Sequence, residues 1–229
     1  MCKSILVKSI DRISGTSSEF TFKSNRIMQG TYTVKFLTIP NTIYNVTDNN
    51  NIILVNTMQT TVPVGHYTSA TITAALKVAL ESVVASVFVV TFNKTTGKIT
   101  ISSTDVFTLS FPNNFNNLIG FPATVSSVTT YTSDKIVKLS KPSLGITIQQ
   151  ASDPIENASN DATISTLYVP LINVFGEYTT ITNLDLKQTV EIADRTRLLN
   201  IKITDNETNE TLDLNGSEWE MLLCRCMAQ

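Results

Sequence analysis

The chain has 229 residues, enough to bury one sizeable core, and only 16% of them are charged, with a net charge of −2. This weak charge argues against nucleic acid as a specific partner, because proteins that bind nucleic acid concentrate Lys and Arg on one face. Frequent Thr, Val, Ile and Phe suit a pleated, half-buried surface and predict a mostly-β globular protein.

The start of the chain shows no signal peptide or membrane anchor. Its apolar runs are too short for a signal peptide, and no window reaches the roughly 20 apolar residues of a membrane-spanning helix. We therefore expect synthesis in a cytoplasm and no membrane insertion. Residues 1–18 are expected to form an N-terminal arm, which adds a strand, lies on a neighbour or frays.

Strand signals then follow at short intervals. Strands are predicted at 19–23, 30–39 and 52–56, and Pro40 ends the second because it has no backbone N–H to donate. An Asn- and Asp-rich loop separates the second strand from the third. Short strands divided by turn residues are the pattern of a β-sandwich or barrel.

A single amphipathic helix interrupts this pattern at 69–83. Its apolar residues recur at helical spacing and form one stripe, whereas Lys77 and Glu81 lie off the stripe. Thr68 or Ser69 can cap the first turn. The stripe predicts a helix that packs over an edge or end of a β core, and the lack of a basic polar face argues against membrane binding.

A hairpin follows the helix, with strands at 87–92 and 98–102 around a loop that ends in Gly97. Glycine adopts positive φ without steric cost, as such loops require. The Thr-Gly-Lys run in this loop is not a phosphate-binding loop. Phe92 stands where that motif needs its first glycine, and Ile99 follows the lysine.

The rest of the chain predicts further strands and no second domain. Strands are expected at 107–111, 125–131, 135–139, 144–150, 163–169, 177–184, 189–192, 198–204, 211–216 and 218–224, with a short helical turn near 113–118. Residues 151–161 are polar and are the best candidate for a long exposed loop. Since no change of composition divides the chain, residues 19–229 are expected to form one domain.

Residues suited to catalysis or metal binding are few. His66 is the single histidine, and its place beside a glycine at a strand-to-helix junction favours a structural role. One histidine with Cys224 and Cys226 does not supply the four ligands of a zinc site, and with Cys2 the three cysteines form no disulfide framework. Trp219 could stack on a sugar or a base, but its apolar neighbours favour a core or interface position.

Acidic residues leave one catalytic alternative open. Asp185 with Glu191, or Asp213 with Glu218, could serve a glycosidase, but solvated carboxylates on turns and strand ends are favoured. Residues 48–51 share the composition of a calcium loop without its spacing. We therefore predict no catalytic, cofactor-binding or metal-binding residues.

Two blocks of the sequence resemble a known family. The first runs from Gly65-His-Tyr67 through the helix and Val-Thr-Phe-Asn-Lys-Thr-Thr-Gly-Lys-Ile-Thr-Ile to Phe-Thr-Leu-Ser-Phe and Leu-Ile-Gly-Phe121. The second runs from Ile201-Lys-Ile-Thr-Asp205 to Leu212-Asp-Leu-Asn-Gly-Ser-Glu-Trp-Glu-Met-Leu222. They resemble the minor capsid proteins of virophages, Polinton-like viruses and some large DNA viruses.

The resemblance implies an all-β fold, a single jelly-roll sandwich of two antiparallel sheets with the helix near 69–83 inserted. It implies a structural protein and not an enzyme: a penton, whose homopentamer closes the fivefold vertices of an icosahedral virion. Double-jelly-roll major capsid proteins are the implied neighbours, and the implied location is the virion, assembled in the host cytoplasm. A virion receptor-binding or lectin-like β-sandwich head is the alternative, and a β-sandwich hydrolase is a third interpretation.

Overall fold

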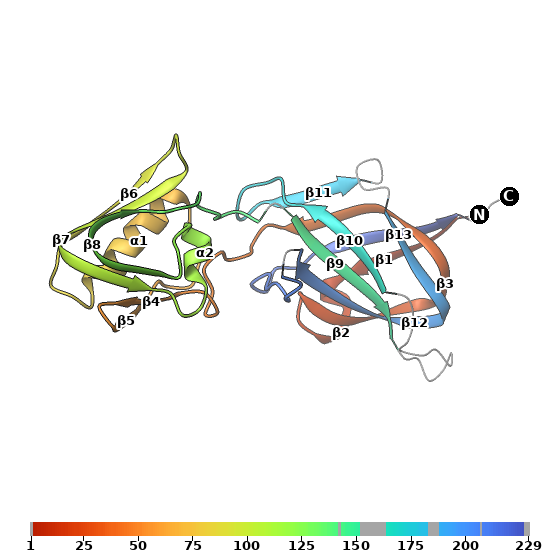
Figure 1. Ribbon diagram of the computed structural model, residues 1–229. Coiled ribbons are helices and arrows are strands. Elements are labelled where there is room, and N and C mark those ends of the chain that lie inside the picture. The colour runs from red at the N-terminus through yellow and green to blue at the C-terminus, as the bar shows by residue number, and fades with distance from the viewer. Residues whose placement is uncertain (1, 142, 152–163, 183–187, 207, 227–229) are drawn as a thin grey trace. The chain divides into compact units, whose positions relative to one another are not determined.

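The computed structural model describes residues 2–141, 143–151, 164–182, 188–206 and 208–226, and its strands form two antiparallel sheets (Figure 1). Contacts divide the chain into two compact units: unit 1 comprises Met1–Ile43 and Pro142–Gln229, and unit 2 comprises Tyr44–Lys141. The predicted class, mostly β with antiparallel sheets and few helices, is confirmed. The sequence suggested one domain over 19–229, but each sheet has its own core.

Unit 1 is built on the larger sheet. It contains β1 Cys2–Lys8, the 3-10 helix η1 Ser9–Asp11, β2 Arg12–Gly15, β3 Glu19–Pro40, β9 Ser143–Gln150, β10 Ile164–Pro170, β11 Tyr178–Thr182, β12 Thr189–Asp205 and β13 Glu220–Cys226. The strand order is β1-β13-β3-β12-β9-β10, and β2 and β11 also pair with β3. Val7 of β1 and Leu167 of β10 belong to one buried cluster, so the sheet curves around a single core.

The long strand β3 has different partners along its length. Thr33 pairs with Thr189 of β12 and with Cys224 of β13, so these two strands lie on opposite edges of β3. β2 shares β3 partners with β12, so it lies on the opposite edge, the one that also holds β13. In the same way, β11 shares β3 partners with β13, so it lies on the edge that also holds β12. Sequence reasoning divided β3 into strands at 19–23 and 30–39, because Gly30 and the polar residues before it interrupt the apolar alternation.

Gln188, which immediately precedes β12, covers part of the outer edge of β10. The Gln188 carboxamide accepts a hydrogen bond from the Tyr168 N–H (2.7 Å) and donates one to the Tyr168 carbonyl (2.9 Å). The Glu191 N–H donates to the Ser165 hydroxyl (2.9 Å). These bonds satisfy backbone groups that would otherwise offer a template for another strand.

The predicted N-terminal arm folds onto the sheet of its own unit. β1 pairs with β13 along its whole length, and β2 pairs with β3, so the added-strand alternative describes residues 2–15. Trp219 anchors the segment: its backbone N–H donates to the Ser9 hydroxyl (2.8 Å) and its indole N–H to the Ser17 carbonyl (2.8 Å). Trp219 is 3% exposed, which confirms the predicted core position.

A charged group extends this anchor. Arg12 Nη1 donates to Glu218 Oε1 (2.8 Å), and the Ser9 hydroxyl donates to the other carboxylate oxygen. Partial burial alone raises the pKa of Glu218, but the bonds from Ser9 and Arg12 outweigh it, so the pKa of this carboxyl lies below its ordinary value. The ionised form of Glu218 therefore stabilises the attachment of the N-terminal segment.

Unit 2 carries the predicted helix and hairpin. It contains β4 Ile52–Val55, β5 Met58–Thr61, α1 Ser69–Glu81, β6 Phe88–Asn93, β7 Lys98–Ser110, α2 Phe115–Ile119 and β8 Thr124–Thr132. The strand order is β5-β4-β7-β6, with β8 also on β7. Thr68 caps α1 through a reciprocal bond with Thr71, and Ile72, Leu76, Ala79 and Leu80 are buried, as the stripe predicts.

Several predicted strands differ from the structure. Residues 135–139 form no strand, because their N–H groups bond to three separate carbonyls, those of Gly120, Gly97 and Leu118. Residues 211–216 form one isolated bridge and a turn, in which Asn215 and Gly216 have positive φ. The predicted loop at 151–161 falls, except for residue 151, outside the described residues.

One amide holds the two ends of unit 2 together. The Asn45 side chain donates to the carbonyls of Leu139 and Tyr67 (2.7 Å each) and accepts from the Tyr67 N–H (2.9 Å). Asn45 follows the start of the unit and Leu139 precedes its end. A continuous segment with adjacent ends and its own core has the properties of an independently folding domain.

We therefore expect the isolated fragment 44–141 to fold. Its amide NMR spectrum should be well dispersed and its thermal unfolding cooperative, because the core around Leu76 and Phe107 lies within the fragment. Asn45→Ala should lower its melting temperature, since the change leaves three backbone groups without this partner. A fragment that stays unfolded under native conditions would contradict the independence of unit 2.

Gly120 and Gly216 provide a matched pair for testing backbone strain. Both have positive φ, but a Cβ at Gly120 would lie 2.2 Å from the Lys135 carbonyl oxygen, whereas a Cβ at Gly216 meets nothing within 4 Å. Gly216→Ala should cost roughly 1–2 kcal/mol of unfolding free energy, and Gly120→Ala clearly more. Urea unfolding of the full chain measures both, and equal losses would contradict the steric argument.

The Glu218 anchor should make stability depend on pH. Since the folded-state pKa is depressed, the stabilisation is present above the unfolded value, roughly 4.3, and is lost as pH falls through the folded-state pKa. Glu218→Gln should therefore destabilise the protein by about 1 kcal/mol at pH 7, and the difference should shrink under acid. Urea unfolding of wild type and variant at pH 7 and at an acidic pH below the folded-state pKa measures this difference.

Glu220→Gln is the control for this comparison. Glu220 lies 3.7 Å from Lys8 in an exposed ion pair, a type that contributes roughly 0–1 kcal/mol and whose loss should depend less on hydrogen bonding than that of Glu218. A loss for Glu218→Gln that is the same at both pH values would show that the carboxylate charge plays no part in the anchor.

Candidate functional site

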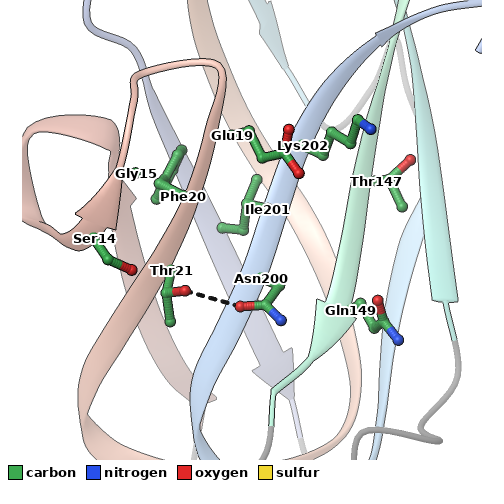
Figure 2. A pocket seen from close by; sticks show the side chains of 10 residues that line it. All are labelled: Ser14, Gly15, Glu19, Phe20, Thr21, Thr147, Gln149, Asn200, Ile201 and Lys202. Atoms are coloured by element: carbon green, nitrogen blue, oxygen red, sulfur yellow. Dashed lines mark hydrogen bonds between the residues drawn. The ribbon is translucent and has the colours of Figure 1, made fainter. Parts of the chain in front are cut away.

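A shallow polar groove lies on the outer face of the unit 1 sheet (Figure 2). Cross-strand register places Thr21, Asn200 and Gln149 in one row, and Glu19, Lys202 and Thr147 in the next. The groove has a volume of about 370 Å³ and is lined by Ser14, Gly15, Glu19, Phe20, Thr21, Thr147, Gln149, Asn200, Ile201 and Lys202.

The groove offers hydrogen bonds and no evident reaction chemistry. The Thr21 hydroxyl donates to Asn200 Oδ1 (2.9 Å), and Glu19 accepts from Thr211. Phe20, its aromatic lining residue, is 4% exposed and offers no open ring face to a sugar. The lining holds hydroxyls, amides, one carboxylate and one ammonium group, but no histidine or cysteine. Such a surface suits polar contacts better than acid–base or nucleophilic catalysis.

None of the other candidate residues is part of the lining of this groove. His66 is half-buried in unit 2, in the segment before α1. Cys224 is buried, with its sulfur 3.2 Å from the Ser4 hydroxyl, while Cys2 and Cys226 are register partners of β1 and β13. Across the described ranges, no group of three or more His, Cys, Asp or Glu residues is placed to hold a metal ion.

The carboxylate pairs considered as a glycosidase alternative are not brought together by any described contact. Asp185 lies outside the described residues, and Glu191 is exposed on β12. Asp213 accepts the Asn215 N–H (2.7 Å) within a turn, whereas Glu218 is engaged by Ser9 and Arg12. In residues 48–51, the Asn50 side chain closes a local turn by accepting from the Thr47 N–H (2.7 Å).

An exposed apolar surface is the feature that sequence reasoning missed. Tyr168, Ile172, Val174 and Tyr178 are each more than half exposed, and they flank or lie in the loop from β10 to β11. We call these four residues the β11 surface. The sequence signal is a stretch from 164 to 182 with Glu177 as its single charge and apolar residues where a loop normally has polar ones.

A second apolar surface lies on the N-terminal segment. Leu6 of β1, Ile10 of η1 and Ile13 of β2 are exposed, the last two by more than half. We call these three residues the N-terminal surface. Single exposed apolar residues are common, but groups of them on one segment are typical of protein contact sites.

None of the helices in the described part of the chain has the length and apolarity needed to span a membrane.

Comparisons with known proteins find a likeness among solved structures and none among family models or curated sequences. No protein-family model matches the chain, and no curated protein sequence matches it. Among solved structures, the chain is similar to the crystal structure of the selenomethionine-labelled mavirus penton protein, with 12% sequence identity, coverage of 97% of this chain and 98% of that chain, and a TM-score of 0.47.

Proposed function

We propose that this protein is a structural minor capsid protein, a penton whose homopentamers close the fivefold vertices of an icosahedral virion. The observation that carries the proposal is the pair of exposed apolar surfaces on unit 1 of a chain with few charged residues. Exposed apolar groups of this kind mark binding surfaces for other proteins. A protein that works by assembly needs such surfaces and needs no catalytic constellation.

The two sequence blocks that resemble minor capsid proteins support the same function. The first block forms α1, the β6–β7 hairpin and α2 of unit 2. The second block covers the end of β12, the turn before β13 and the start of β13, and it includes Trp219. Both blocks thus fall on elements that build the two cores, Leu76 and Phe107 in one and Ile203 and Met221 in the other.

The proposal includes partners and a location. The protein binds copies of itself in the ring, and the rim of the ring binds double-jelly-roll major capsid proteins in the virion, after assembly in the host cytoplasm. It performs no reaction. Identical subunits close a ring when each uses two different surfaces, one for each neighbour. Unit 1 offers two such surfaces.

The second candidate function is a lectin-like or receptor-binding head, and the polar groove of Figure 2 is the observation that favours it. Hydroxyl and amide groups in two rows can bond to sugar hydroxyls. Without an exposed aromatic ring in the lining, the groove lacks the apolar platform that usually supports a bound sugar. The capsid function is therefore favoured.

Native mass spectrometry of the purified full chain tests the proposal. We expect an assembly of five copies of the 25.1-kDa chain, since a fivefold vertex requires a pentameric ring. Electron microscopy of the same sample should show fivefold rings, and in purified virions the protein should occupy the vertices. A stable monomer or trimer, or a position away from the vertices, would refute the penton.

A glycan array tests the second candidate on the same sample. The capsid proposal expects no specific binding, whereas a lectin-like head expects binding that Asn200→Ala abolishes, because this residue lies in the centre of the groove's polar rows. Thr91→Ala, at an exposed β6 position in unit 2, is the matched control and should leave any binding unchanged.

A further inference from the structure

The β11 surface and the N-terminal surface lie on opposite sides of β3. β11 pairs with β3 residues 36–40 on the edge that also holds β12. β13 pairs with β3 residues 33–38 on the other edge, and β1 lies beyond it. The strands β1, β13, β3 and β11 therefore form a continuous sheet, with β1 and β11 as its two margins.

These margins are complementary in strand direction. Every pairing in this part of the sheet is antiparallel, so direction alternates from β1 through β13 and β3 to β11. The β1 strand of a second copy, placed beside β11, would continue the alternation as an antiparallel neighbour. Among the described strands, β1 pairs only with β13 and β11 only with β3, and on β11 the Asn173 side chain donates to one backbone group, the Tyr178 carbonyl.

Each surface has one exposed charged residue close to it in the sequence. Glu177, the single charged residue between 164 and 182, is exposed beside the β11 surface, and within the described residues it takes part in no ion pair. Lys3 is exposed on β1 and, in the same described part, also forms no ion pair. Lys3 alternates with the buried Ile5 and Val7 along β1, so it lies on the sheet face opposite to the exposed Leu6, and the match of the two surfaces therefore rests on their apolar side chains and strand margins.

We propose that the β11 surface of one copy binds the N-terminal surface of the next copy, with β11 and β1 side by side. This inference rests on the proposed homopentamer and assigns its contact. A second copy is the partner because a single chain carries both halves of the match: two apolar groups and two strand margins. Each copy uses both surfaces, so the contact is heterologous and closes into a ring.

Two double variants separate the surfaces. Ile172→Glu with Val174→Glu introduces charge into the β11 surface, and Ile10→Glu with Ile13→Glu does so in the N-terminal surface. Val78→Glu with Val106→Glu is the matched control in unit 2, where both residues are also more than half exposed. All six positions face solvent in the single chain, so the fold should persist, which circular dichroism and thermal unfolding check.

Native mass spectrometry should give a distinct result for each sample. Each of the two surface variants alone should fall from five copies to one, because every contact in the ring needs both surfaces. A mixture of the two variants should give a species of two copies and nothing larger, since only one intact pair of surfaces can form between them. The control variant should remain at five copies.

Other results would overturn the assignment. If the wild type is a pentamer and both surface variants remain pentamers, the penton function stands and this contact is wrong. If only one of the two surface variants dissociates, the surface changed in that variant binds a different part of the neighbouring copy, and the proposed pairing is wrong. A mixture of the two variants that forms five-copy rings would also exclude the proposed pairing. A wild type that is not a pentamer removes the proposed function together with this inference.

Discussion

The backbone pairing of β3 is the constraint on which unit 1 depends. This strand of 22 residues pairs with four others, β2 and β13 along one edge and β12 and β11 along the other. Its buried residues, among them Tyr32 and Leu37, lie in the core of unit 1. Because each pairing fixes a register, a slip of one residue in β3 would turn its buried side chains outward and displace all four neighbours.

Local signals allowed the helix and hairpin of unit 2 to be predicted. Thr68 caps α1 and Gly97 takes positive φ, and both effects operate within a few residues of the chain. The division into two units left no local signal, because the joints at Ile43–Tyr44 and Lys141–Pro142 resemble the strand ends around them in composition. The failure at 135–139 has the same cause: its alternating residues bond to separate segments that only the tertiary fold brings near.

The candidate sites show the same limit. Trp219 could be assigned to the core, since its apolar neighbours stand next to it in the sequence. The polar groove could not be predicted, because Gln149 and Asn200 become neighbours of Thr21 only through strand register. The β11 surface did have a sequence signal, the nearly uncharged stretch 164–182, but such a stretch is also typical of buried strands. Only the exposure of these side chains in the folded protein distinguishes an apolar surface from a buried strand.

The Asn45 bond to Leu139 has a consequence for how the chain folds. Unit 2 interrupts unit 1 between β3 and β9, which lengthens the chain that must be closed before these strands join one sheet. Once unit 2 has folded, Asn45 holds its two ends within hydrogen-bond reach, and the long interruption acts as a short connection. Early folding of the inserted segment thus lowers the effective contact order of the surrounding unit and favours rapid pairing of its distant strands.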